Sequence, residues 1–189
     1  MHVLPWNATT LAFLFAGKCW VSLEDVLTGA RFTYSVKQKV RMGYAPDPKN
    51  PAQQVYTVVE RFPFWFVSLQ VGAIGEATPR YLGVIEPATG FRTTAKTASN
   101  ALATAENINM FGDVLRDLSA GLDRANQVRI WHCGRCGHCA RALSVPSSIA
   151  TGFGPDCAEK LGIEMTDTKP TLIEKIAALD EPANPPKEI

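Results

Sequence analysis

The sequence predicts an α+β protein in which an antiparallel β-meander is packed by a long helix and followed by a small cysteine-rich module. Residues between 19 and 94 fall into short segments with alternating apolar and polar side chains, the pattern of half-buried strands. Residues 102–122 instead carry apolar side chains every three to four positions, which indicates one face of a helix. Four of the five cysteines then lie between residues 132 and 157.

The expected strands and short helices follow one another along the chain. A helix is expected over residues 8–16, with Asn7 or Thr9 as its N-cap, and a β-hairpin over residues 19–24 and 31–40. Cys19 falls on the apolar face of that hairpin, so we expect a buried thiol. Further strands are expected at residues 55–60, 64–71, 80–86, 91–94 and 128–131.

Two segments are assigned from single residues that start or break regular structure. Residues 41–54 contain Pro46, Pro48 and Pro51, a composition typical of loops, so this segment is expected to be the most mobile part of the fold. Ser99 is expected to cap the long helix that reaches Leu122.

The most informative run of the chain contains Cys133, Cys136 and Cys139, and Cys157 follows it after a gap. A Cys-x-x-Cys pair turns the chain back so that both thiolates face one metal ion, at about 2.3 Å for zinc. The other half of such a site must come from a separate segment. Cys157 suits this role, because Pro155 predicts the start of a helix whose N-terminus favours a thiolate.

The cysteines allow two overlapping pairs, Cys133-x-x-Cys136 and Cys136-x-x-Cys139, of which only one can belong to a single ion. Around the second pair the chain reads His-x-x-x-Cys-x-x-Cys, then Leu-x-x-Pro-x-Ser-Ile, then Gly-x-Gly-Pro-x-Cys. This order resembles the C-terminal cysteine cluster of a family of small, mostly uncharacterised phage-encoded proteins. The matching residues are His132, Cys136, Cys139, Leu143, Pro146, Ser148, Ile149, Gly152, Gly154, Pro155 and Cys157.

Together the spacing and the resemblance favour Cys136, Cys139 and Cys157 as ligands, with His132 as the fourth and Cys133 as its alternative. Ala140, where such knuckles usually carry glycine, and Cys133 depart from the family's pattern. Residues 15–18 and 29–34 resemble the same family more loosely. We therefore predict one structural Zn²⁺ per chain, held in a C-terminal zinc-finger module.

Other cysteine chemistry fits the sequence less well. Residues 136–139 read Cys-Gly-His-Cys, the redox motif of protein disulfide isomerases, but those sites follow an aromatic residue and precede a long helix in a βαβ unit. Here Arg135 comes first, and residues 144–148 break any helix. Neither Cys-x-x-Cys pair is followed by histidine, as c-type haem attachment requires. A catalytic zinc would need a nearby base, and no His-x-Glu or His-Glu-x-x-His pattern occurs.

Composition supports a globular protein with unevenly distributed charge. The 189 residues are 46% hydrophobic and carry a formal net charge of +1. Residues 31–96 hold nine Lys and Arg against four Asp and Glu, whereas residues 156–189 hold four against eight. We expect an α+β domain over residues 1–128, the zinc-binding module over 129–165, and a short helix with a disordered acidic tail over 166–189.

A cytoplasmic location is expected from the first residues and from the cysteines. Residues 11–19 resemble a lipoprotein signal, but no Lys or Arg precedes Lys18, so the positive segment of a signal peptide is missing. No run approaches the eighteen or so apolar residues of a membrane span. A dense cysteine cluster without a signal peptide favours a reducing compartment, where thiolates bind metal.

Three function classes remain, and nucleic-acid binding is favoured. A basic, aromatic sheet can hold single strands, because rings stack on bases while Lys and Arg neutralise phosphates. Lys37 and Lys39 alternate along one expected strand, and the alternative explanation for them is protection of a sheet edge from pairing with another chain. The candidate nucleic-acid-binding residues are Arg31, Tyr34, Lys37, Lys39, Arg41 and Lys49, extended on the cysteine module by Arg135, His138 and Arg141.

The second class is an effector that attaches to a host or phage protein, for example an enzyme or defence complex. The acidic C-terminal segment, with a short apolar helix at residues 170–179, would carry this function. An enzyme is the third class and is not expected, because glycine-rich phosphate loops, Ser/His/Asp order and paired carboxylates are absent from the sequence. Thiol-disulfide oxidoreductase activity is the remote alternative.

Overall fold

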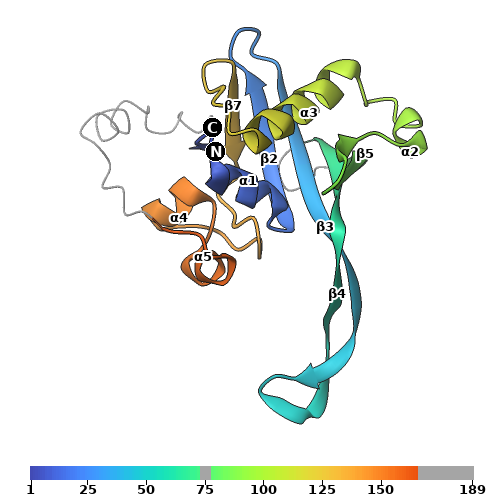
Figure 1. Cartoon of the computed structure of the whole chain (residues 1–189), viewed down its shortest axis with the longest axis vertical. Helices are drawn as coiled ribbons and strands as arrows, with labels where there is room; N and C mark the ends of the chain where they lie inside the picture. The colour runs from blue at the N-terminus through green and yellow to red at the C-terminus, as the bar shows by residue number, and fades with distance from the viewer. Residues whose placement is uncertain (73–77, 166–189) are drawn as a thin grey trace, which may run out of the picture.

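The computed structural model describes residues 1–72 and 78–165 and has an α+β architecture, as expected (Figure 1). One antiparallel sheet has the strand order β1-β7-β2-β3-β4-β5-β6. Its strands are β1 (His2–Leu4), β2 (Lys18–Asp25), β3 (Arg31–Asp47), β4 (Asn50–Val71), β5 (Thr78–Glu86), β6 (Gly90–Arg92) and β7 (Val128–His132). The helices are α1 (Ala8–Phe15), α2 (Ala95–Ala98), α3 (Ala105–Ser119), α4 (Pro146–Thr151) and α5 (Pro155–Leu161).

The strands β2 to β6 form the predicted meander, since each pairs with the next along the chain. The strands expected separately at residues 55–60 and 64–71 belong to one strand, β4, which lies between β3 and β5. Strand β7 returns to the other side and pairs with both β1 and β2. This arrangement places the segment that leads into the cysteines beside the start of the chain. The three-residue β1 was not predicted, because so short a run shows no periodicity.

One face of the sheet is buried under α1 and α3 and forms the core (Figure 1). Tyr34 of β3 is fully buried there, its ring lies 5.0 Å from that of Phe111 in α3, and its hydroxyl donates to the Asn107 carbonyl at 2.8 Å. The expected burial of Cys19 is confirmed, and burial raises the pKa of its thiol to about 12. These groups act through packing and need no partner outside the core.

The helices begin and end partly where the sequence predicted. Asn7 caps α1, because its side chain accepts from the amides of Thr9 and Thr10. The single helix expected from Ser99 to Leu122 was wrong at both ends. Ser99 is the C-cap of α2, and α3 starts after Thr104, whose hydroxyl accepts from the Asn107 amide at 3.3 Å. Thr104, followed three residues later by Asn107, is also a helix start signal, and the long helix begins there instead of at Ser99.

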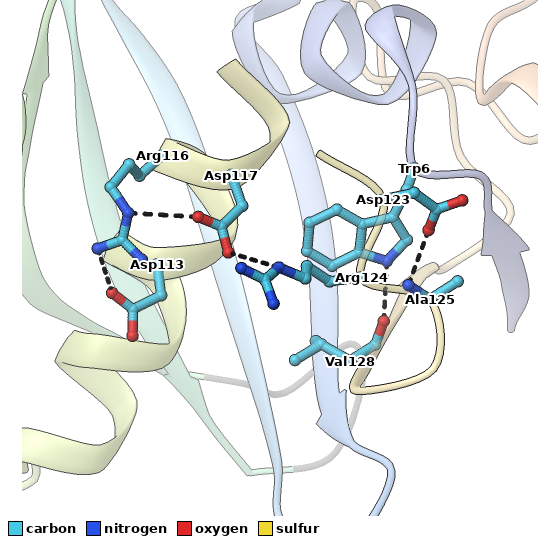
Figure 2. Close-up of polar contacts among 8 residues, drawn as sticks. All are labelled: Trp6, Asp113, Arg116, Asp117, Asp123, Arg124, Ala125 and Val128. Atoms are coloured by element: carbon cyan, nitrogen blue, oxygen red, sulfur yellow. Dashed lines mark hydrogen bonds and ion pairs between the residues drawn. The ribbon is translucent and has the colours of Figure 1, made fainter. Parts of the chain in front are cut away.

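Ion pairs and a tryptophan tie α3 and the N-terminus to the loop before β7 (Figure 2). Arg116 contacts both Asp113, at 2.7 Å, and Asp117, at 3.3 Å. Asp117 also reaches Arg124 of the loop at 3.5 Å. The indole N–H of Trp6 donates to the Val128 carbonyl at 2.8 Å. These links fix the start of β7 against α3 and the N-terminal segment. The chain enters the cysteine module at the other end of β7.

The predicted loop over residues 41–54 is wrong, because β3 and β4 continue beyond the body as one two-stranded ribbon (Figure 1). We call residues 41–60 the β-arm. Its pairing runs from Arg41–Glu60 to Asp47–Asn50, around a turn at Pro48 and Lys49. Proline is tolerated in a ribbon whose outer edges have no neighbouring strand, so Pro46 and Pro51 do not break it. None of the residues of the β-arm is buried.

Residues 166–189, including the short helix expected at 170–179 and the predicted acidic tail, lie outside the described residues. Within the described ranges no helix combines the length and the apolar character needed to cross a membrane.

Candidate metal centre and outer sheet face

Three cysteines from two separate segments meet at one point. Cys136 and Cys139 lie in the loop after β7, and Cys157 lies in the first turn of α5. Their three sulfur atoms all lie within 4.8 Å of one another. Tetrahedral zinc at about 2.3 Å from each sulfur would space the sulfurs by about 3.8 Å. The separation of the three sulfurs is therefore compatible with one metal ion.

The loop that carries Cys136 and Cys139 is a tight knuckle. The Cys136 amide donates to the Arg141 carbonyl at 2.9 Å, and the Ala140 amide donates to the Cys136 carbonyl at 2.9 Å. Ala140 adopts a left-handed conformation with φ 62°, the conformation that glycine usually supplies in such knuckles. Ala140 therefore adopts the backbone conformation that glycine would supply, at the cost of some strain.

Backbone amides favour a thiolate at Cys136. Burial raises its pKa, but the amides of Cys139, Gly154 and His138 aim at its sulfur and bring the pKa below the ordinary value. Burial instead raises the pKa of Cys157 to about 12, and the sulfurs of Cys136 and Cys139 add to this increase. Three sulfurs this close cannot all be thiolates without a compensating charge. A cation at their centre supplies that charge, so the donor set fits a metal ion.

His132 does not join the three sulfurs, which corrects the predicted fourth ligand. Its side chain is fully buried on the core face at the end of β7, and its Nε2 atom lies 2.8 Å from the Ile149 carbonyl of α4. Burial, the main cause, lowers the pKa of this imidazole to about 4. His132 therefore packs as a neutral core residue that joins the sheet to α4. No other His, Cys, Asp or Glu within residues 1–72 and 78–165 joins the group.

Cys133, the alternative fourth ligand, also lies apart from the group. It follows His132 directly and lines a small crevice with Met1, Trp20 and Thr33, on the face of the sheet away from the helices. The sequence spacing was compatible with either register of the Cys-x-x-Cys pairs. The alternation of β7 decides between them, because neighbouring residues of a strand point to opposite faces.

The cysteine module is fixed to the body through Phe13 of α1. A Cβ atom on Gly137 would lie 2.7 Å from the Phe13 ring, and one on Gly152 would lie 2.5 Å from it. Both glycines therefore allow the loops to close over this ring. The Gly137 carbonyl also accepts from the Lys18 amide at 2.9 Å, and Nδ1 of His138 lies 2.9 Å from the Ala16 carbonyl. The module is thus joined to the junction of α1 and β2.

The redox alternative loses its structural basis. The Cys-Gly-His-Cys motif lies in a loop, and the strands of the described sheet pair only in antiparallel fashion. A thioredoxin-like site needs a parallel βαβ unit with the motif at the start of its helix.

The predicted nucleic-acid-binding residues fall into three groups. Tyr34 was wrongly included, because its ring is buried against α3. Arg41 is paired with Glu60 at 3.0 Å in the β-arm, and Lys49 lies in its turn. Arg31, Lys37, Lys39, Arg135 and Arg141 are exposed, and His138 is half-buried.

The face of the sheet away from α1 and α3, which we call the outer face, carries residues that were not predicted from the sequence, namely Lys18, Trp20, Phe66 and Tyr81. Lys18 pairs with Lys37, and Lys37 pairs with Phe66. In the next outward-facing row Trp20 pairs with Ser35, and Ser68 of β4 pairs with Tyr81. The signal that could have found them is alternation: they have the opposite parity to the core residues of the same strands.

Aromatic rings on this face form a file. The rings of Phe62 and Phe64 lie 5.8 Å apart, those of Phe64 and Phe66 lie 5.6 Å apart, and Tyr81 follows at 6.3 Å. The side chain of Phe66 is 38% exposed. Lys96 lies over the Tyr81 ring at 5.3 Å. We call these four rings the aromatic file.

Fold and site together define an antiparallel α+β protein with a C-terminal, zinc-finger-like three-cysteine module. A family model described as a family of unknown function (DUF6011) matches residues 132–162, the segment that holds the three cysteines. The comparison with curated proteins gives no match, and neither does the comparison with solved structures.

Proposed function

We propose that this protein is an accessory protein that binds single-stranded nucleic acid on its outer face and is stabilised by one structural zinc ion. The observation that carries the proposal is the aromatic file with lysines beside it. Exposed rings accept bases by stacking, and this contact tolerates any sequence because every base has a π-face. The resemblance to phage-encoded proteins extends the proposal to a phage accessory protein in the reducing cytoplasm of a host.

Charge on the outer face supports binding to phosphates. In the body of the protein, β2, β3 and β7 present Lys18, Arg31, Lys37 and Arg129 on this face against Glu24. Glu24 lies 3.7 Å from Arg31 and 3.4 Å from Arg129, which leaves the two lysines to meet a phosphate. Lys39 lies at the base of the β-arm and is exposed. A strand laid along the file would therefore have cations on one side.

The zinc module lies next to this surface because Gly137 is bonded to Lys18 through the backbone. Arg135 and Arg141 are exposed on the cysteine loop and extend the positive charge. Soft thiolate ligands and a compact knuckle favour zinc among common ions. In this proposal the ion fixes the loop and performs no chemistry.

The test is fluorescence anisotropy with a labelled single-stranded 20-mer at several salt concentrations. The double variant K37E/K39E should weaken binding at least about tenfold and reduce the slope of log K against log salt by about 1.4, because each single-strand phosphate contact contributes about 0.7. Phe66→Ala should weaken binding about 5-fold to 100-fold through lost stacking. No retention of the strand at low salt would reject the proposal.

Two matched controls separate surface effects from stability. Lys160 is exposed in α5, so K160E makes one such charge reversal away from the outer face and should leave affinity within about twofold. Tyr34→Phe removes a buried hydroxyl and should lower stability without changing affinity, because this ring faces the core. A loss of binding free energy in K160E half as large as that in K37E/K39E would show that net charge alone matters.

A protein-binding effector is the second candidate, and the β-arm favours it. Met42, Tyr44, Tyr56 and Val59 are exposed along the arm, with Tyr44 at 74%. The charges of residues 41–60 cancel, since Arg41 and Lys49 are matched by Asp47 and Glu60. A neutral apolar ribbon suits a protein partner better than a phosphate backbone. Stoichiometric capture of one bacterial protein that is lost with the arm would support this candidate.

A further inference from the structure

A cavity of about 920 Å³ opens between α3 and the edge of the sheet formed by β5 and β6. Its lining joins the end of α1, the Trp65 position of β4 and one side of α3. This volume lies within the range of about 300–1,000 Å³ found for small-molecule sites. The aromatic file lies on the opposite side of β4, because Trp65 and Phe66 are neighbours in one strand.

Aromatic rings form the walls of this cavity. Phe15 and Trp65 meet edge to face with centroids 4.9 Å apart, and the Trp65 indole N–H already donates to the Phe15 carbonyl at 3.1 Å. Phe91 on the other side meets Phe111 at 5.0 Å. The polar group of Trp65 is thus satisfied within the protein. What the walls offer a ligand is apolar ring surface.

Gly112 is a second, independent sign of a site. It lies in the middle of α3, where glycine costs about 1 kcal/mol relative to alanine. A Cβ at this position would lie 3.4 Å from the Phe91 ring, which is ordinary contact, so packing does not exclude alanine. A larger side chain here would project between α3 and Phe91, two walls of the cavity. The glycine keeps that space open at a cost in helix stability.

The charges around the cavity balance, so the lining favours an uncharged ligand over a strongly charged one. Its charged lining residues are Glu86, Arg92, Asp113 and Arg116, whose charges cancel. Arg92 lies 2.6 Å from Glu86, and Arg116 is held by Asp113 and Asp117 (Figure 2). The carboxylates of Glu86 and Asp113 thus already neutralise the two arginines. Asn109, Thr93 and Ser119 in the lining supply hydrogen-bonding groups without charge.

From these observations we propose that the cavity is a binding site for an uncharged, planar aromatic small molecule of two or three fused rings with polar atoms at its edge. The ring body lies against Trp65 and Phe91, and the edge atoms meet the polar lining. This site is separate from the outer face and does not depend on nucleic-acid binding.

The test is titration of the full chain with 1-aminoanthracene, an uncharged three-ring probe whose emission rises in apolar surroundings. We expect saturable binding with a stoichiometry of one. Gly112→Leu should weaken it at least about tenfold. Asn109→Trp, which adds bulk at an exposed lining position, should do the same and covers the case that Gly112→Leu fails to fold. Circular dichroism and thermal unfolding check that each variant is folded.

Two controls make the outcome decisive. Ala120→Leu adds the same side chain at the exposed C-cap of α3, outside the cavity lining, and should retain wild-type affinity. Anthracene-1-sulfonate, a probe of the same ring size with a negative charge, should bind at least about fivefold more weakly. The proposal is overturned if the uncharged probe does not bind, if folded Gly112→Leu and Asn109→Trp bind it as wild type does, or if the anion binds equally well.

Discussion

The body of the protein and its β-arm are built from the same two strands but are stabilised differently. In the body, β3 and β4 bury Val36 and Val67 completely beneath the helices. In the arm the same strands keep their hydrogen-bonded pairing, yet no residue between 41 and 60 is buried. A two-stranded ribbon is marginal by itself in water, so the arm relies on the sheet that continues it. Substitutions of buried residues in the body should therefore affect stability more than substitutions in the arm.

Loss of the proposed zinc ion should be the most damaging change to the body. Cys157→Ser removes one of the three clustered cysteines, so if they hold the proposed zinc ion we expect its loss, unfolding of at least residues 132–165, and a fall in Tm of more than about 10 °C. Native mass spectrometry and thermal unfolding, before and after chelation, measure both effects. Cys133→Ser is the matched control and should keep the ion, because Cys133 lies apart from the cluster. A variant Cys157→Ser with full metal content and unchanged Tm would contradict the ligand set.

Phe13→Ala should have the next largest effect on stability. The ring is fully buried and lies against both Gly137 and Gly152, so its removal leaves a cavity where the cysteine module meets α1. We expect a loss of about 3–5 kcal/mol in the free energy of unfolding, measured by urea denaturation. Phe62→Ala truncates a partly exposed ring of the aromatic file and should cost clearly less. Equal costs would show that this junction is not tightly packed.

The buried His132 should make stability fall in acid. Its pKa is about 4 when folded, below the ordinary 6.5, so between these values the unfolded chain binds the additional proton. Stability due to this group is thus complete above pH 6.5 and decreases by up to about 1.4 kcal/mol per pH unit as the pH falls toward 4. Urea denaturation of wild type and His132→Gln across this window isolates the effect from proton uptake by the cysteines. Parallel pH curves for the two proteins would contradict it.

Replacement of the β-arm should have the smallest effect on stability. Val40 and Arg61 are paired across the ribbon, so an Asn-Gly turn can join them in place of residues 41–60. We expect the free energy of unfolding to change by less than about 1 kcal/mol, because little surface is buried there. Affinity for single strands should stay within about threefold. Loss of strand binding in this variant would move the nucleic-acid site from the outer face to the arm.

Local patterns predicted the elements that are defined by their own residues. The helix after Asn7, the hairpin of β2 and β3, and the strands of the meander were all visible as caps or alternation. The arm was missed because three prolines between residues 46 and 51 imitate a loop. Proline excludes a strand only where its missing N–H is needed by a neighbour. Whether a neighbouring strand is present depends on the whole sheet and not on the segment.

The sequence by itself determined that Cys136, Cys139 and Cys157 belong together, because two-residue spacing and a helix start constrain where thiolates can point. Only the tertiary structure decided that His132 and Tyr34 serve the core. Both lie in strands whose alternating pattern marks two faces but does not say which face the helices cover. Packing of α3 and α4 makes that choice, because burial of a strand residue is set by elements far away in the chain.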